Sequence, residues 1–90
     1  MNKTDFEFDP AKRDSTRRKH GLDFVGAQAL WQDERRLEVP ARTREEPRFL
    51  VIGVIDGKHW SVVVTFRGDR IRLISARRAR EEEVEWYEGS

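Results

Sequence analysis

The chain has no cysteine among its 90 residues, which excludes a disulfide framework, a thiolate nucleophile and a thiolate metal site. It also lacks any apolar run near the roughly 18 residues that a membrane-spanning helix requires. Phe6 and Phe8 are the main apolar side chains near the N-terminus, so nothing there resembles a signal peptide. These absences predict a single cytoplasmic domain over residues 1–90 that has no association with membranes.

Several motifs for binding or catalysis are also missing. Gly53, Gly57 and Gly68 lie in strand or turn contexts and do not form a phosphate loop ahead of a helix. The two histidines, His20 and His59, do not have a zinc-like spacing. No serine lies in a nucleophile-elbow motif. The sequence therefore predicts no metal and no cofactor, and it leaves positioned acids, bases and charges as the available chemistry.

Charge is present in abundance and is unevenly distributed. Residues 67–80 hold six arginines against the single acid Asp69, and residues 10–20 hold five basic side chains against Asp14. Residues 81–90 hold five glutamates. The planar guanidinium fork of arginine suits phosphate oxygens, so two basic segments on a chain of net charge +1 predict a surface for nucleic acid. A solvated charged surface is the alternative.

Hydrophobic periodicity and turn residues predict an α+β fold with two N-terminal helices, a twisted antiparallel β-meander and a C-terminal helix. Asp9-Pro10 begins the first helix, which runs to Lys19 or His20, and Asp23 caps a second from Phe24 to Trp31 or Gln32. The expected strands are 6–8 and 37–39 at edges, 48–55, 60–66 and 70–75, with the last helix over 79–88.

The expected helices should cover one face of the sheet. Phe24, Trp31, Val84 and Tyr87 are the apolar side chains that we expect on that face. The opposite face would then be partly open, and the arginines of the last hairpin would project onto it.

RNA cleavage is a reaction that such residues can perform, because the ribose 2′-OH supplies the nucleophile. The protein must hold the phosphate, move two protons and stabilise the phosphorane with cations. His20 is the natural proton carrier, or else a cap on its own helix. Arg67, Arg72 and Arg77 would clamp the phosphate, or else form surface ion pairs with glutamates.

Two further polar residues share a face of the last helix. Glu83 and Tyr87 are four residues apart, and they either move protons or form a hydrogen-bonded structural pair. His59, beside the expected Asp56-Gly57 turn, is interpreted as solvent-exposed.

Four segments occur in a characteristic order: residues 6–12, Arg18-Lys19-His20-Gly21-Leu22-Asp23-Phe24, residues 67–79, and Glu83 with Tyr87. Through these segments the chain resembles the BrnT toxins over about residues 5–88. The resemblance implies a RelE-like fold, a ribonuclease activity that blocks translation, and a hetero-oligomer with a BrnA-type antitoxin that alone contacts operator DNA. One departure is Asp23-Phe24-Val25-Gly26, which lacks the acidic pair often seen after the phenylalanine.

The matching polar positions are the candidate site. The candidate catalytic residues are Lys19, His20, Arg67, Arg72, Arg77, Glu83 and Tyr87, and the candidate RNA-binding residues are Lys12, Arg70, Ser75 and Arg78. The alternative function is a non-catalytic module that uses the same basic face to bind RNA or a protein partner. A third possibility is that this face mainly serves as the interface with an acidic antitoxin.

Overall fold

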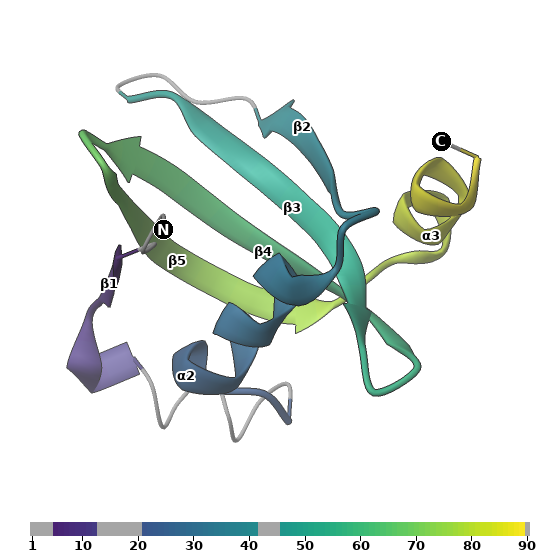
Figure 1. The fold of residues 1–90 in the computed structure, drawn as a ribbon, viewed down its shortest axis with the longest axis horizontal. Helices are drawn as coiled ribbons and strands as arrows, with labels where there is room; N and C mark the ends of the chain where they lie inside the picture. The colour runs from purple at the N-terminus through teal and green to yellow at the C-terminus, as the bar shows by residue number, and fades with distance from the viewer. Residues whose placement is uncertain (1–4, 13–20, 42–45, 90) are drawn as a thin grey trace.

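The computed structural model describes residues 5–12, 21–41 and 46–89 (Figure 1). The elements in chain order are β1 (Asp5–Phe8), α2 (Phe24–Ala27), the 3-10 helix η1 (Gln28–Gln32), β2 (Leu37–Ala41), β3 (Arg48–Ile55), β4 (Lys58–Arg67), β5 (Arg70–Arg78) and α3 (Glu81–Glu88). The strands form one five-stranded sheet in the order β1-β5-β4-β3-β2. The predicted α+β class is confirmed, and so is the edge position of β1 and β2.

The sheet is mixed, so the prediction of a purely antiparallel meander is wrong. Strands β2 to β5 do form an antiparallel meander, but β1 pairs with β5 in parallel, with Phe6 opposite Ile71 and Phe8 opposite Leu73. Both phenylalanines pack against the core through this pairing. The pairing depends on this long-range burial, because a four-residue strand has few stabilising contacts of its own.

The described residues do not contain the two complete N-terminal helices of the prediction. Pro10–Lys12 begin a helical turn, and the rest of the first predicted helix lies outside the described residues. The second is the short α2, which continues as η1. Asp23 caps α2 as predicted, because its carboxylate accepts a hydrogen bond from the Gly26 N–H at 2.8 Å. Glycine lowers helix propensity, which suits the early change to a 3-10 helix.

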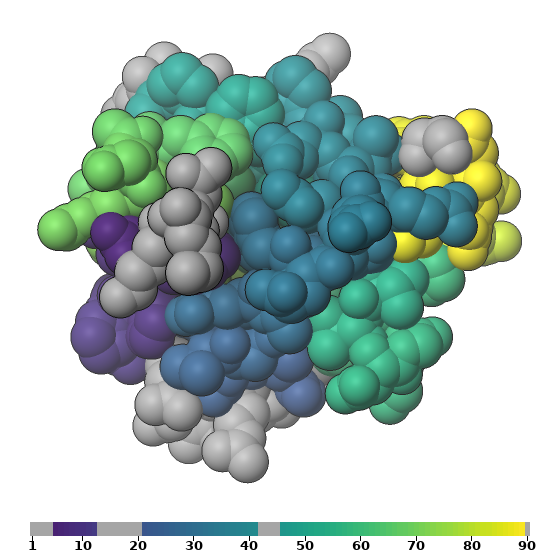
Figure 2. Space-filling view, in the orientation of Figure 1, coloured from purple at the N-terminus to yellow at the C-terminus, as the bar shows by residue number. Residues whose placement is uncertain are grey.

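The apolar core lies between α2, η1 and one face of the sheet. Phe24, Ala27 and Leu30 are fully buried against strand residues such as Val62 and Val64. Figure 2 shows the segment that carries them, in blue, covering the face of the sheet turned to the viewer. A large apolar side chain such as Phe24 or Leu30 contributes about 1.5–3 kcal/mol when fully buried, so this face supplies much of the hydrophobic stabilisation.

Helix α3 packs on the other face, contrary to the prediction that Val84 and Tyr87 would share a face with Phe24. Trp60 and Val62 belong to the core, so Ser61 between them points to the opposite side, and its hydroxyl bonds Glu83 of α3. A buried carboxylate requires hydrogen-bond donors, and these donors lie on the sheet face opposite the core.

No helix among the described residues is long and apolar enough to cross a bilayer.

Candidate functional site

A β-bulge decides which side chains of β5 share a face. Val63 pairs with Ser75 and Val64 pairs with Leu73, so Ile74 has no partner of its own in the ladder. A bulge inserts one extra residue and shifts the alternation of every residue after it. Most of the predicted residues of β5 consequently lie together on the face opposite the core, which we call the arginine face. They are Arg70, Arg72, Ser75 and Arg77.

Arg78 lies on the other side of the sheet. Its guanidinium carbon is 5.4 Å from the centroid of the Trp60 ring, and its Nε donates to the carbonyl of His59 at 3.3 Å. Trp60 belongs to the core cluster, so Arg78 is separated by the sheet from the other candidate RNA-binding residues of β5.

Three arginines surround one carboxylate at the turn between β4 and β5. Glu7 of β1 is 3.9 Å from Arg67, 3.6 Å from Arg70 and 3.6 Å from Arg72, measured between carboxylate oxygens and guanidinium nitrogens. Arg67 is also 3.7 Å from Glu46. All these contacts are longer than a hydrogen bond, and the Arg70 side chain is 63% exposed. The three arginines, named here the arginine cluster, therefore keep accessible donors.

Arg77 is held differently, at the far end of the arginine face. Its two terminal nitrogens donate to the two oxygens of Glu83 at 2.7 and 2.8 Å. Glu83 is 3% exposed and accepts further bonds from the Ser61 hydroxyl at 2.9 Å and the Arg80 N–H at 2.8 Å. The geometry is a bidentate, charge-assisted pair, the strongest kind of side-chain hydrogen bond.

These bonds settle the charge state of the pair. Burial raises the pKa of the Glu83 carboxyl, but the hydrogen bonds from Arg77, the Arg80 N–H and Ser61 outweigh it and bring the pKa to about 2. The hydrogen bond to Glu83 also raises the pKa of Arg77. Both groups are therefore charged at neutral pH, and Glu83 then has no proton to donate.

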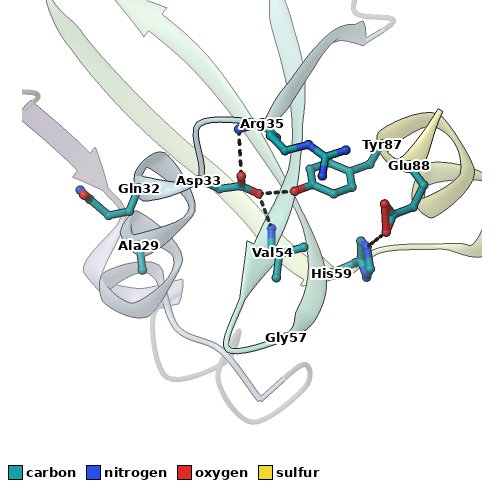
Figure 3. A pocket seen from close by; sticks show the side chains of 9 residues that line it. All are labelled: Ala29, Gln32, Asp33, Arg35, Val54, Gly57, His59, Tyr87 and Glu88. Carbon is teal, nitrogen blue, oxygen red and sulfur yellow. Dashed lines mark hydrogen bonds and ion pairs between the residues drawn. The ribbon is translucent and has the colours of Figure 1, made fainter. Parts of the chain in front are cut away.

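Tyr87 bonds a residue that the sequence did not single out. Its hydroxyl donates to Asp33 at 2.7 Å, and the same carboxylate accepts from the N–H groups of Val54 and Arg35, both at 2.9 Å (Figure 3). The hydrogen bond to Asp33 and then burial raise the pKa of the Tyr87 hydroxyl. Glu83 and Tyr87 thus share a helix face, as predicted, but each has a different partner.

Asp33 joins three elements at this point. Burial raises the pKa of its carboxyl, whereas the hydrogen bonds from Tyr87 and from the two backbone N–H groups lower it, with a net lowering. Asp33 follows η1, and Val54 lies in β3 beyond Ile52, the last residue of β3 that pairs with β2. The carboxylate therefore accepts a backbone N–H of β3 at a point where β2 no longer pairs with it, and it ties α3 to β3 through Tyr87.

A pocket of about 540 Å³ opens beside this junction (Figure 3). His59 lines it with Arg35 and Glu88. The interpretation of His59 as solvent-exposed is wrong: its side chain is 24% exposed, its Nε2 is 3.2 Å from Glu88, and its ring meets Tyr87 edge-on. Local sequence carried no sign of these contacts, because Glu88 and Tyr87 lie about thirty residues further along the chain.

The structure therefore divides the predicted site residues of the arginine face into two groups, the arginine cluster near Glu7 and the Arg77–Glu83 pair near α3. Arg72 and Arg77 are five residues apart on β5, which corresponds to about 15 Å along a strand. Ser75 lies exposed between them on the arginine face. Lys12 lies beside Arg72, where both line a small pocket. Lys19 and His20 lie outside the described residues.

A family comparison identifies the class of protein to which this arrangement belongs. The family model described as "Ribonuclease toxin, BrnT, of type II toxin-antitoxin system" matches residues 8–83. The chain belongs to the BrnT family. The match covers β2 to β5 entirely and includes the arginine face. The family predicted from the sequence is confirmed, and BrnT proteins are the ribonuclease toxins of type II toxin–antitoxin systems. No curated protein matches the sequence significantly.

Proposed function

We propose that this BrnT chain is an endoribonuclease that cleaves RNA by attack of a ribose 2′-OH on the adjacent phosphate, without a metal ion, and so inhibits translation. The observation that carries the proposal is the arginine face, where the Ile74 bulge places Arg72, Ser75 and Arg77 on the same side of the sheet. A row of cations on an open sheet suits a phosphodiester whose charge grows in the transition state. We also propose that the α+β fold is of the RelE type.

The two groups of residues take different roles in this proposal. Arg67 and Arg72, whose contacts with Glu7 are longer than hydrogen bonds, clamp the phosphate, while Arg70, Ser75 and Lys12 bind the adjoining backbone. Arg78, on the opposite face, binds a more distant part of the strand. Lys19 and His20 move the protons, with His20 as the principal carrier.

Arg77, Glu83 and Tyr87 complete the proposed catalytic set. Arg77 stabilises the phosphorane, and Glu83 acts as a positioning residue, because a carboxylate with a pKa of about 2 holds the guanidinium in place and transfers no proton at neutral pH. Tyr87 offers a hydroxyl at the edge of the same helix, and release of its bond to Asp33 would free it for proton transfer.

The partner that follows from the family is an antitoxin. We propose that a BrnA-type antitoxin binds this chain in a hetero-oligomer, covers the arginine face, and alone contacts operator DNA. The proposed site of action is the cytoplasm, where both RNA and the antitoxin are made.

The test is RNA cleavage by purified protein in EDTA, with wild type, His20→Ala and Arg67→Ala compared and the product ends analysed. We expect 2′,3′-cyclic phosphate ends from wild type and loss of most cleavage in both variants. Cleavage that requires added metal, or that survives both substitutions unchanged, would contradict the proposed mechanism.

A non-catalytic binding module is the second candidate. It is favoured by one observation: both the Arg77 guanidinium and the Tyr87 hydroxyl already have short hydrogen bonds to acidic partners. This candidate predicts salt-sensitive RNA binding without any cleaved product. The same assay separates the two, because a single cyclic-phosphate end excludes it.

A further inference from the structure

A half-buried arginine at the start of β3 has no partner among the described residues. Arg48 makes no hydrogen bond or ion pair there, and its Nε is buried. The other arginine with a buried and unbonded Nε, Arg36, is placed differently: its Nε is 3.6 Å from Glu38, and its NH1 donates to two carbonyls. A buried charged donor without an acceptor is costly, so an unpaired Arg48 points to an anion that is bound from solution.

Arg48 lines a polar pocket of about 150 Å³ together with two other cations. Lys12 comes from the turn after β1, Arg72 comes from β5, and the remaining wall is formed by Asp9, Glu46, Leu73 and Ile74. The two acids already have other contacts: Asp9 accepts a hydrogen bond from the Ala11 N–H at 3.0 Å, and Glu46 lies 3.7 Å from Arg67. Three cations therefore face a pocket that can hold a group about as large as phosphate.

The sheet register places these cations in a row. Thr65 pairs with Arg72, and Arg48 lies one position beyond the Phe49–Val64 pair, so Arg48, Thr65 and Arg72 follow one another across three strands. Strands lie about 4.8 Å apart, which sets the two arginine Cα atoms about 10 Å apart. This separation allows two guanidinium groups to reach one anion above the small side chain of Thr65.

The backbone that carries Arg48 is fixed in advance. Thr65 is 2% exposed, and its hydroxyl donates to the carbonyl of Pro47 at 2.8 Å, directly before Arg48. Arg48 also pairs with Ala41 of β2. Binding an anion would therefore order little more than the side chains themselves, which favours affinity.

We propose that Arg48, Lys12 and Arg72 form a binding subsite for one backbone phosphate of single-stranded RNA, next to the arginine cluster. The proposal rests on the proposed function, which makes RNA the substrate, and adds Arg48 and a defined position on the sheet. The subsite binds the phosphate next to the one that Arg67 and Arg72 clamp, so that Arg72 lies between the two phosphates and contacts both. The subsite would fix the position of the RNA strand along the arginine face.

The test uses an RNA oligonucleotide with 2′-O-methyl groups, which lacks the attacking hydroxyl and so reports binding without cleavage. Its affinity is measured by fluorescence anisotropy over a series of salt concentrations for wild type, Arg48→Gln, Arg48→Lys and the control Arg36→Gln. We expect Arg48→Gln to weaken binding about ten-fold and to reduce the slope of log affinity against log salt by about 0.7. Arg48→Lys should restore the slope but not the full affinity.

Two results would overturn the subsite: unchanged RNA affinity in a folded Arg48→Gln protein, or an equal loss in Arg36→Gln. Inorganic phosphate provides a second readout, because it should shift the NMR signal of the Arg48 Nε–H in wild type. A phosphate shift without any effect of Arg48→Gln on RNA affinity would show a site for free anions only and would also reject the proposal.

The subsite and the proposed function fail in distinguishable ways. If wild type cleaves no RNA but Arg48→Gln still loses affinity, the catalytic proposal fails and the subsite stands. If cleavage is normal and Arg48→Gln binds like wild type, only the subsite fails. Should Arg48→Gln not fold, the slope and affinity measured with Arg48→Lys decide the question.

Discussion

The two ends of the arginine face hold their charges in different ways. At the α3 end, Arg77 and Glu83 meet in a bidentate pair at 2.7 and 2.8 Å, and Glu83 is almost completely buried. At the β1 end, Glu7 lies 3.6–3.9 Å from its three arginines, and Arg48 has no partner among the described residues. Short buried contacts stabilise a fold and fix geometry, whereas long exposed ones are easily exchanged for a ligand. We infer that the α3 end holds Arg77 in a fixed position, whereas the β1 end binds the RNA backbone.

Glu83→Ala should give the largest loss of stability. The variant removes the buried carboxylate that accepts hydrogen bonds from Arg77 and from the Ser61 hydroxyl. Breaking a buried ion pair by removing one partner costs about 3–5 kcal/mol. Urea unfolding followed by circular dichroism measures it. Glu7→Ala is the matched control and should cost less than about 1 kcal/mol, because its contacts are long and partly exposed. Equal losses in the two variants would remove the proposed difference between the ends.

The pH dependence of stability should show the same contrast. Because the pKa of Glu83 is lowered from 4.5 to about 2 in the folded protein, its contribution is complete above pH 4.5 and is lost as the pH falls toward 2. The expected loss is about 3 kcal/mol, and Asp33, whose pKa is also lowered, adds in the same direction. Denaturant unfolding at several pH values tests this, and Glu83→Gln should flatten the profile. An unchanged profile in the variant would mean that other carboxylates dominate.

Tyr87→Phe should have a smaller effect at the same end. It removes the donor at 2.7 Å from Asp33 but leaves the Val54 and Arg35 N–H groups bonded to that carboxylate. Loss of one hydrogen bond to a charged group costs about 1.5–3 kcal/mol, and the remaining donors favour the lower value. Thermal unfolding gives the cost, and a cleavage assay at a temperature where the variant is folded tells whether the hydroxyl also takes part in chemistry. Stability equal to wild type would show that the bond does not anchor α3.

Glu7→Gln should change stability least and RNA binding in the opposite direction. Removing one negative charge from among Arg67, Arg70 and Arg72 leaves their donors to the ligand, so affinity for uncleavable RNA should rise several-fold at low salt. Stability should change by less than about 1 kcal/mol. Weaker RNA binding would mean that Glu7 orients the arginine cluster. The β1 end would then be held in position by its carboxylate, as Arg77 is by Glu83.

Some expectations failed because they depended on distant contacts. The place of His59 beside a turn predicts an exposed side chain, yet Glu88 and Tyr87 of α3, about thirty residues further along the chain, contact it. Asp33 was overlooked because nothing near it in the sequence distinguishes it from a surface acid, and its three donors come from β3, from α3 and from the backbone of Arg35. The sequence pattern of one chain does not indicate contacts between residues that lie so far apart.

The sequence by itself determined the local features of this protein. A nearly continuous apolar run predicted β3 with its observed ends at 48 and 55, Asp56-Gly57 formed the expected turn with positive φ angles at both residues, and Asp23 capped its helix. The family was also evident from short motifs in order. Each of these depends on neighbouring residues, where sterics, hydrogen bonding and hydrophobic periodicity act directly.

Only the tertiary structure decided the rest. It determined that β1 pairs in parallel with β5 and that α3 packs on the arginine face. It also contains the bulge at Ile74 that turns Ser75 and Arg77 to the same side of the sheet as Arg72. It also placed Arg48 in one pocket with Lys12 and Arg72. These outcomes depend on which buried groups find partners across the whole sheet, a competition among long-range contacts that no local pattern encodes.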